Sequence, residues 1–182
     1  MSNSYLDLVK QTFNFPQEGI DVKDGYLHFN GLDLKTLIAN HGTPLKLTYL
    51  PKIGMQIKKA KQMFAAAFKK HKYEGKYFYC YCTKSSHFSF VVEEALKHDI
   101  NLETSYAYDI EIIKKLYAKK KITKDIHIIC NGFKQKGYTR RIAGLLNDGW
   151  QNVVPVLDNK EELKEYATSV KVPFKLGIRV AA

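Results

Sequence analysis

Three charged residues follow or end apolar segments and could take part in chemistry. Lys84 follows the run YFYCYCT, and Glu103 and Arg179 stand near the ends of two later apolar runs. A lysine at the end of an apolar strand is costly to bury as a cation, so burial favours its neutral amine. The neutral amine can attack a carbonyl and form a Schiff base. In a simpler interpretation, which spacing alone slightly favours, Lys84 extends to solvent or pairs with Glu103 for structure.

The elements that must position these residues form a repeat. Strands are expected to begin near residues 77, 101, 126, 152 and 174, and apolar residues at helical spacing lie between them. Strands that alternate with helices predict a parallel sheet. Chemistry in such proteins lies at the carboxyl ends of the strands. If sequential strands pair, Glu103 ends the strand beside the one that leads to Lys84.

Two architectures fit this repeat, an open doubly wound sheet and a (β/α)8 barrel. A complete barrel takes roughly 250 residues, and this chain has 182 and about five βα units. We expect a partial (β/α)8 TIM-like barrel over residues 51–182, beginning with a long helix from Ile53 to His71. The chain ends at a strand, so we expect it to be part of a longer protein.

Residues 1–50 are predicted to form a separate segment of short strands and a short helix. The turn signals Asp24-Gly25 and Asn30-Gly31 interrupt short apolar runs. Leu34, Leu37 and Ile38 indicate the helix, and PLKLTYL, residues 44–50, is predicted to be a further strand.

Other polar residues at the strand ends favour structural roles. Asn131-Gly132 is typical of a turn, and Asp158 and Asn159 are typical of helix caps. His87 is expected to be structural. The patterns of the common nucleotide, hydrolase and zinc-protease motifs do not occur in the sequence.

Composition limits the remaining classes of function. The net charge is +11, but only three of the 29 basic residues are arginine. Arginine is favoured for reading bases, so no specific nucleic-acid recognition is expected. A basic α/β module that binds nucleic acid through phosphates stays an alternative.

The three cysteines, Cys80, Cys82 and Cys130, form no CxxC pair, which favours reduced thiols and no metal site. The sequence contains neither a bilayer-spanning apolar run nor, in MSNSYLDLVKQ, a signal peptide, so we expect a cytoplasmic protein without membrane contact.

Four stretches of the chain are characteristic: YCYCTKSSH, LETSYAYDIEII, ICNGFK and KLGIRVA. They resemble the fold-type III pyridoxal-phosphate decarboxylases, the alanine-racemase-like barrel family of ornithine, diaminopimelate and arginine decarboxylases. GTPLKLTYLPKI resembles the entry to that barrel. The resemblance covers about residues 42–182 and is greatest to bacterial biosynthetic arginine decarboxylases.

The resemblance implies a role for each of the three charged residues. Lys84 matches the catalytic lysine that holds pyridoxal 5'-phosphate as a Schiff base. Glu103 matches an acidic residue near that bond, and Arg179 matches an arginine near the cofactor ring. The implied reaction is α-decarboxylation of a basic amino acid, arginine first, or ornithine or diaminopimelate. The implied full-length protein is a homodimer.

The sequence departs from the family pattern in places. Ser86 stands where the family has asparagine, and Tyr106 stands where small residues are common. The family's phosphate loop, its acidic partner of the ring nitrogen, its stacking histidine and its C-terminal β-domain have no counterpart here. We therefore expect the isolated chain to be inactive. A racemase-like or non-catalytic homologue that binds the same cofactor stays an alternative.

Overall fold

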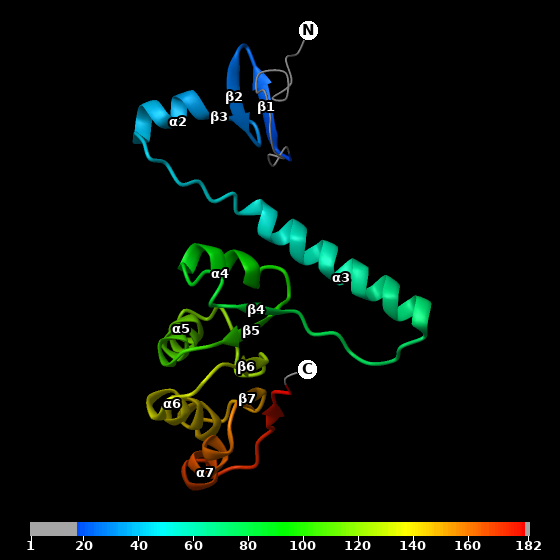
Figure 1. Cartoon of the computed structure of the whole chain (residues 1–182), viewed down its shortest axis with the longest axis vertical. Coiled ribbons are helices and arrows are strands. Elements are labelled where there is room, and N and C mark those ends of the chain that lie inside the picture. Colours follow the sequence, from blue (N-terminus) through cyan, green and yellow to red (C-terminus); the bar gives the residue numbers. More distant parts are fainter. Residues whose placement is uncertain (1–17, 181–182) are drawn as a thin grey trace. The chain divides into compact units, whose positions relative to one another are not determined.

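The structure is a computed structural model that describes residues 18–180. The chain divides into two compact units, Met1–Thr48 and Tyr49–Ala182, which are described separately. Figure 1 gives the labels of the elements. The segment MSNSYLDLVKQ, in which we expected no signal peptide, lies outside the described residues.

The described part of the first unit is a small antiparallel sheet followed by a helix. Both predicted turns have left-handed backbone, with φ of 51° and 77° at Asp24-Gly25 and 50° and 81° at Asn30-Gly31. Such turns suit tight hairpins. The Asp33 side chain caps the helix by accepting the Lys35 N–H at 2.9 Å. The elements are β1 (Ile20–Lys23), β2 (Tyr26–Phe29), β3 (Leu32–Asp33) and α2 (Leu34–His41).

The prediction of a strand at residues 44–50 is wrong. This stretch contains neither strand nor helix. An alternating apolar pattern is not enough for a strand, because the backbone N–H and C=O groups also need a neighbouring strand. Pro44 further removes one donor.

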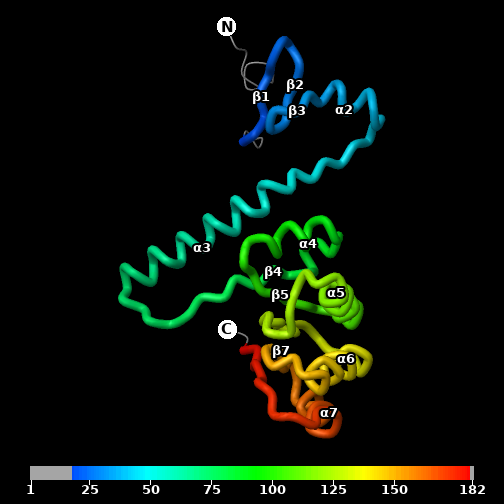
Figure 2. Tube along the Cα trace, turned by 180° about the vertical axis from the view of Figure 1, so that it is seen from behind, coloured from blue at the N-terminus to red at the C-terminus, as the bar shows by residue number. Residues whose placement is uncertain are grey.

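The second unit contains the predicted βα repeat. Its five strands are parallel and lie in sequence order. Helices α4 to α7 lie on one side of the strands in both views (Figures 1 and 2). This confirms the partial TIM-like barrel. The elements are α3 (Pro51–His71), β4 (Cys80–Cys82), α4 (Ser89–Leu96), β5 (Asn101–Thr104), α5 (Ala107–Ala118), β6 (Ile128–Cys130), α6 (Lys136–Asn147), β7 (Val153–Leu157), α7 (Lys160–Ser169) and β8 (Gly177–Ile178).

The two faces of this sheet differ in burial. In β5, Leu102 and Thr104 are buried, whereas Asn101 and Glu103 between them are half-buried. Successive strand residues point to opposite faces, so Leu102 and Thr104 face the helices and Glu103 faces away from them. The sheet therefore presents Glu103 on the face that α4 to α7 leave open.

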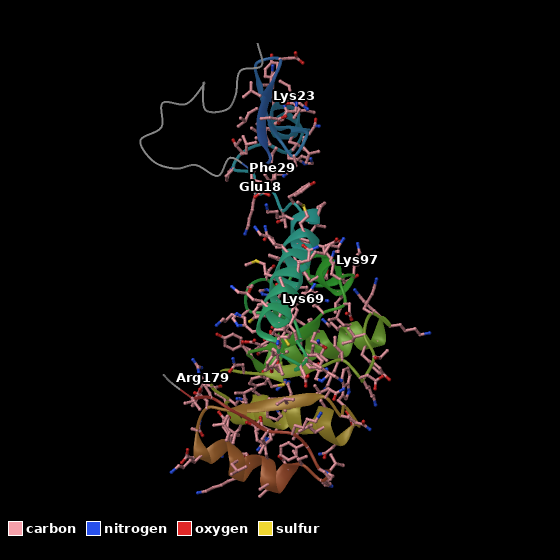
Figure 3. The ribbon with its side chains drawn as sticks, turned by 90° about the vertical axis from the view of Figure 1, so that its right-hand side faces the viewer. Glu18, Lys23, Phe29, Lys69, Lys97 and Arg179 are labelled. Carbon is pink, nitrogen blue, oxygen red and sulfur yellow. The ribbon has the colours of Figure 1, made fainter. Side chains whose placement is uncertain are left out.

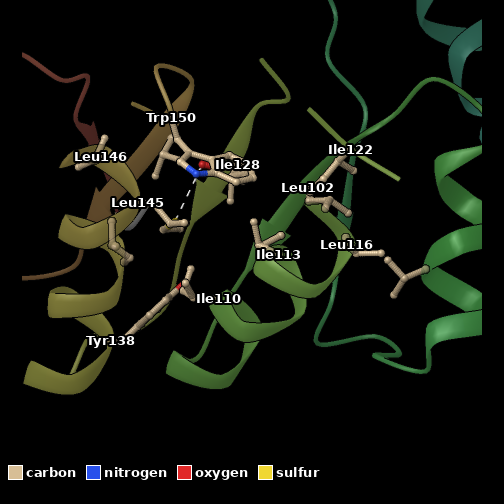
Figure 4. Packing of buried hydrophobic residues seen from close by; sticks show 14 of the residues in the cluster. Leu102, Ile110, Ile113, Leu116, Ile122, Ile128, Tyr138, Leu145, Leu146 and Trp150 are labelled. Atoms are coloured by element: carbon tan, nitrogen blue, oxygen red, sulfur yellow. Dashed lines mark hydrogen bonds between the residues drawn. The ribbon is translucent and has the colours of Figure 1, made fainter. Parts of the chain in front are cut away.

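The hydrophobic core lies between the sheet and its helices (Figure 4). Leu102 and Ile128 from the strands meet Ile110, Ile113 and other side chains of α5 and α6. Burying one such side chain contributes roughly 1.5–3 kcal/mol. No helix within residues 18–180 is both long and apolar enough to cross a bilayer.

Alkaline pH is expected to destabilise this core. Burial raises the pKa of the Cys130 thiol to about 11, and burial also raises the pKa of Tyr138 and Tyr166. A raised folded-state pKa contributes stability that is complete below the unfolded pKa and is lost as pH rises. The free energy of unfolding, measured with urea, should fall between pH of about 9 and about 11. Cys130→Ala should reduce this slope, and an unchanged slope would contradict the assignment.

Candidate functional site

A cavity opens at the carboxyl ends of the first strands of the parallel sheet. Its volume is about 460 Å³, and Lys84, Glu103 and Arg179 all line it. The three charged residues that the sequence singled out therefore border one space. The other lining residues come mainly from the loops after β5 and β6 and from the starts of α5 and α6: Ser105, Tyr106, Ala107, Tyr108, Asn131, Gly132, Phe133, Gln135, Gly137 and Tyr138.

Lys84 lies in a turn after β4. The turn is closed by the Ser85 N–H, which donates to the Cys82 carbonyl at 3.0 Å. β4 ends at Cys82 and Lys84 is exposed, as in the simpler interpretation in which its side chain extends to solvent. Among the hydrogen bonds and ion pairs within residues 18–180, none involves the Lys84 ammonium, so no partner holds this side chain away from the cavity that it lines.

Glu103 lies beside β4 on the open face of the sheet. Its Cα is the register partner of Cys82. Its Oε1 accepts from the Asn131 amide at 3.3 Å and contacts the Cys82 thiol at 3.7 Å. Within the described residues Glu103 and Lys84 form no ion pair, so the structural pairing that we considered for Lys84 is absent there.

Arg179 follows β8, where Figure 3 labels it, and it lines the cavity. Its backbone N–H donates to the Leu157 carbonyl at 3.1 Å, which continues the pairing of β7 and β8. Its guanidinium lies 3.4 Å from the Asp158 carboxylate, and its side chain is 60% exposed. The arginine is therefore held at one edge and leaves most of its donors available.

The loop after β5 is fixed by a buried carboxylate. Asp109 Oδ2 accepts the backbone N–H groups of Ser105 at 2.7 Å and Tyr106 at 3.1 Å. The first turn of a helix favours negative charge, and Asp109 lies in the first turn of α5. Tyr106 lines the cavity but is 61% exposed. The tyrosine in place of a small residue thus forms part of the rim.

The loop after β6 requires glycine at position 132. Gly132 has φ of +78°, and a Cβ there would lie 3.3 Å from the Ser105 carbonyl oxygen. Both features favour glycine. The chain bends with left-handed backbone at Gly132, where the sequence predicted a turn, and Asn131 beside it lines the cavity. Asn159 is confirmed as a helix cap, since it accepts the Glu162 N–H at 3.1 Å.

Lys134 follows the third predicted strand, but the sequence assigned it no role, and the fold buries it beside this site. Its side chain is 0% exposed and its ammonium lies 3.1 Å from Glu162 Oε2, with that carboxylate 2% exposed. The sequence feature that could have indicated this buried pair is a lysine shortly after a strand end together with a glutamate in the first turn of α7. Tyr138, whose hydroxyl lies 2.7 Å from the Thr104 hydroxyl, was also missed as a lining residue.

Comparison with known proteins identifies the fold. No model of a known protein family matches the chain, and no curated protein sequence matches it. Ten chains of solved structures are similar to it. One is the crystal structure of the biosynthetic arginine decarboxylase SpeA from Campylobacter jejuni, at 20% identity and a TM-score of 0.65. The similarity covers 88% of this chain and 29% of that protein, so the chain shares its fold and spans less than a third of its length.

Proposed function

We propose that this chain is the lysine-bearing part of a pyridoxal-phosphate-dependent amino-acid decarboxylase. The observation that carries the proposal is the unpaired side chain of Lys84 at a cavity that Glu103 and Arg179 also line. The fold that the chain shares with the arginine decarboxylase SpeA supports it. In this proposal residues 51–182 form an incomplete cofactor-binding barrel domain and residues 1–50 a separate segment.

The cavity fits such a cofactor. Its volume of about 460 Å³ lies in the range of small-molecule sites. When bound, the cofactor supplies an electron sink for the carbanion that remains after carbon dioxide departs. Lys84 Nζ would hold it covalently and would be displaced by the substrate amine. Glu103 would hold a proton near that bond, and Arg179 would donate hydrogen bonds without readily accepting a proton.

The proposed reaction is α-decarboxylation of a basic amino acid. Arginine is the first choice of substrate, and ornithine or diaminopimelate is the next. The proposal includes a homodimer for the full-length protein, a cytoplasmic location and little turnover by this chain alone. A racemase-like or non-catalytic homologue that binds the same cofactor would use the same lysine.

The proposal predicts a covalent bond between Lys84 and the cofactor aldehyde. Addition of pyridoxal phosphate to the 182-residue chain should produce an absorbance band at longer wavelength than that of the free aldehyde. Lys84→Ala should abolish this new band because the reacting amine is lost. Lys76→Ala, which removes an exposed lysine from the loop before β4, should retain it. An equal band in Lys84→Ala would refute the assignment.

A basic module that binds nucleic acid is the second candidate function. Helix α3 favours it, because PKIGMQIKKAKQMFAAAFKKH contains six lysines and no acidic residue. This alternative predicts affinity for DNA or RNA that falls steeply with salt and survives Lys84→Ala. The cofactor proposal predicts that Lys84→Ala abolishes its binding event, so the one variant separates the two candidates.

A further inference from the structure

Lys134 forms a buried ion pair with Glu162, and every hydrogen-bond donor of the Lys134 ammonium has an acceptor. Lys134 Nζ donates to the Gly132 carbonyl at 2.9 Å, to the Val156 carbonyl and to Glu162 Oε2 at 3.1 Å. An ammonium has three donors, so all are used. The pair thereby joins the loop after β6, the strand β7 and the helix α7.

On one side this pair is linked to Glu103. The Gly132 N–H donates to Asn131 Oδ1 at 2.9 Å. The other group of the same amide, Asn131 Nδ2, donates to Glu103 Oε1 at 3.3 Å. The loop that Lys134 holds by the Gly132 carbonyl is therefore the loop that orients the Glu103 carboxylate.

On the other side the pair is linked to Arg179. Glu162 Oε2 accepts the Asp158 backbone N–H at 3.3 Å. The Asp158 carboxylate then lies 3.4 Å from the Arg179 guanidinium. An unbroken series of contacts thus runs from Glu103, on β5, to Arg179, after β8, and the buried pair is its middle.

We infer that the Lys134–Glu162 ion pair is a positioning element that fixes Glu103 and Arg179 relative to one another at the cavity. This inference rests on the proposed function, because Glu103 and Arg179 are the proposed cofactor contacts and their positions matter only if a cofactor binds there. Neither Lys134 nor Glu162 would touch the cofactor.

A competing explanation is that the pair serves stability alone. Buried ion pairs are weak evidence for stability, because well-packed apolar residues of similar volume are often as stable. Replacing both partners therefore separates the two explanations. The double variant Lys134→Met/Glu162→Met removes the links to both loops while it leaves no buried charge unpaired.

The test compares the wild-type chain, this double variant and a control. The control replaces the partly exposed pair of Lys121, after α5, and Glu93, in α4, by the same changes to methionine. One readout is the NMR signals of the Asn131 side-chain amide and the Arg179 side chain, without cofactor. The second is the dissociation constant for pyridoxal phosphate. The double variant should shift or broaden both signals and weaken binding roughly 10- to 100-fold, as hydrogen-bonded supports behind metal ligands do. The control should change neither.

The outcomes are distinct. Unchanged signals in a folded double variant, or changed signals with unchanged affinity, would overturn the inference. If the wild-type chain binds no cofactor, the proposed function fails and the NMR signals alone decide the positioning. If the double variant does not fold, Asp158→Ala cuts the series at its half-exposed end. Asp158→Ala must then alter the Arg179 signal and weaken cofactor binding. If both stay as in the wild-type chain, the inference is overturned.

Discussion

Lys134→Met alone should lower the free energy of unfolding by about 3–5 kcal/mol. The change leaves the Glu162 carboxylate buried with its ammonium partner gone, and it frees the carbonyls of Gly132 and Val156. Breaking a buried pair is far more costly than replacing both partners, because one charge stays without compensation. Urea unfolding followed by circular dichroism measures the effect.

The matched control is Lys136→Met. Lys136 lies two residues along the chain and is exposed, so the same substitution should change stability by less than about 0.5 kcal/mol. Equal midpoints for the two variants would show that the Lys134 ammonium is not held as described.

Ile110→Ala should destabilise the chain by about 2–5 kcal/mol. Ile110 is 0% exposed and belongs to the cluster between the sheet and α5 and α6. Its truncation loses the burial of the removed atoms and leaves a cavity, since close-packed neighbours relax only in part.

The same substitution at Ile178 provides the control for Ile110. Ile178 is 76% exposed on the short strand β8, so Ile178→Ala should change the unfolding free energy by less than about 0.5 kcal/mol. A comparable loss from both variants would mean that the core does not lie on the helix side of the sheet.

The fold could be predicted largely from local patterns. The strand starts near 101 and 152 and the helix from Ala107 were found because apolar periodicity and caps are local properties of the chain. The prediction of a strand at residues 44–50 was wrong because a strand needs a neighbouring strand to pair with, and the residues of one segment do not show whether such a neighbour exists. Spacing alone could not decide how deeply Lys84 lies, because this depends on where β4 ends, and β4 ends at Cys82.

The candidate site could be predicted in part. Strand ends in a parallel sheet share one edge, so the sequence could group Lys84, Glu103 and Arg179. The supporting residues depend on distant contacts instead. Lys134 meets Glu162 across 28 residues of sequence, and no local pattern distinguishes it from the many exposed lysines.

Borohydride reduction followed by peptide mapping tests the central claim most directly. The chain is mixed with pyridoxal phosphate, reduced and digested, and the modified lysines are located by mass spectrometry. Our account predicts one dominant modification, at Lys84, that is lost in Lys84→Arg, which keeps the charge without a reactive amine. Modification spread over exposed lysines to the same extent as at Lys84, or no modification at Lys84, would contradict it.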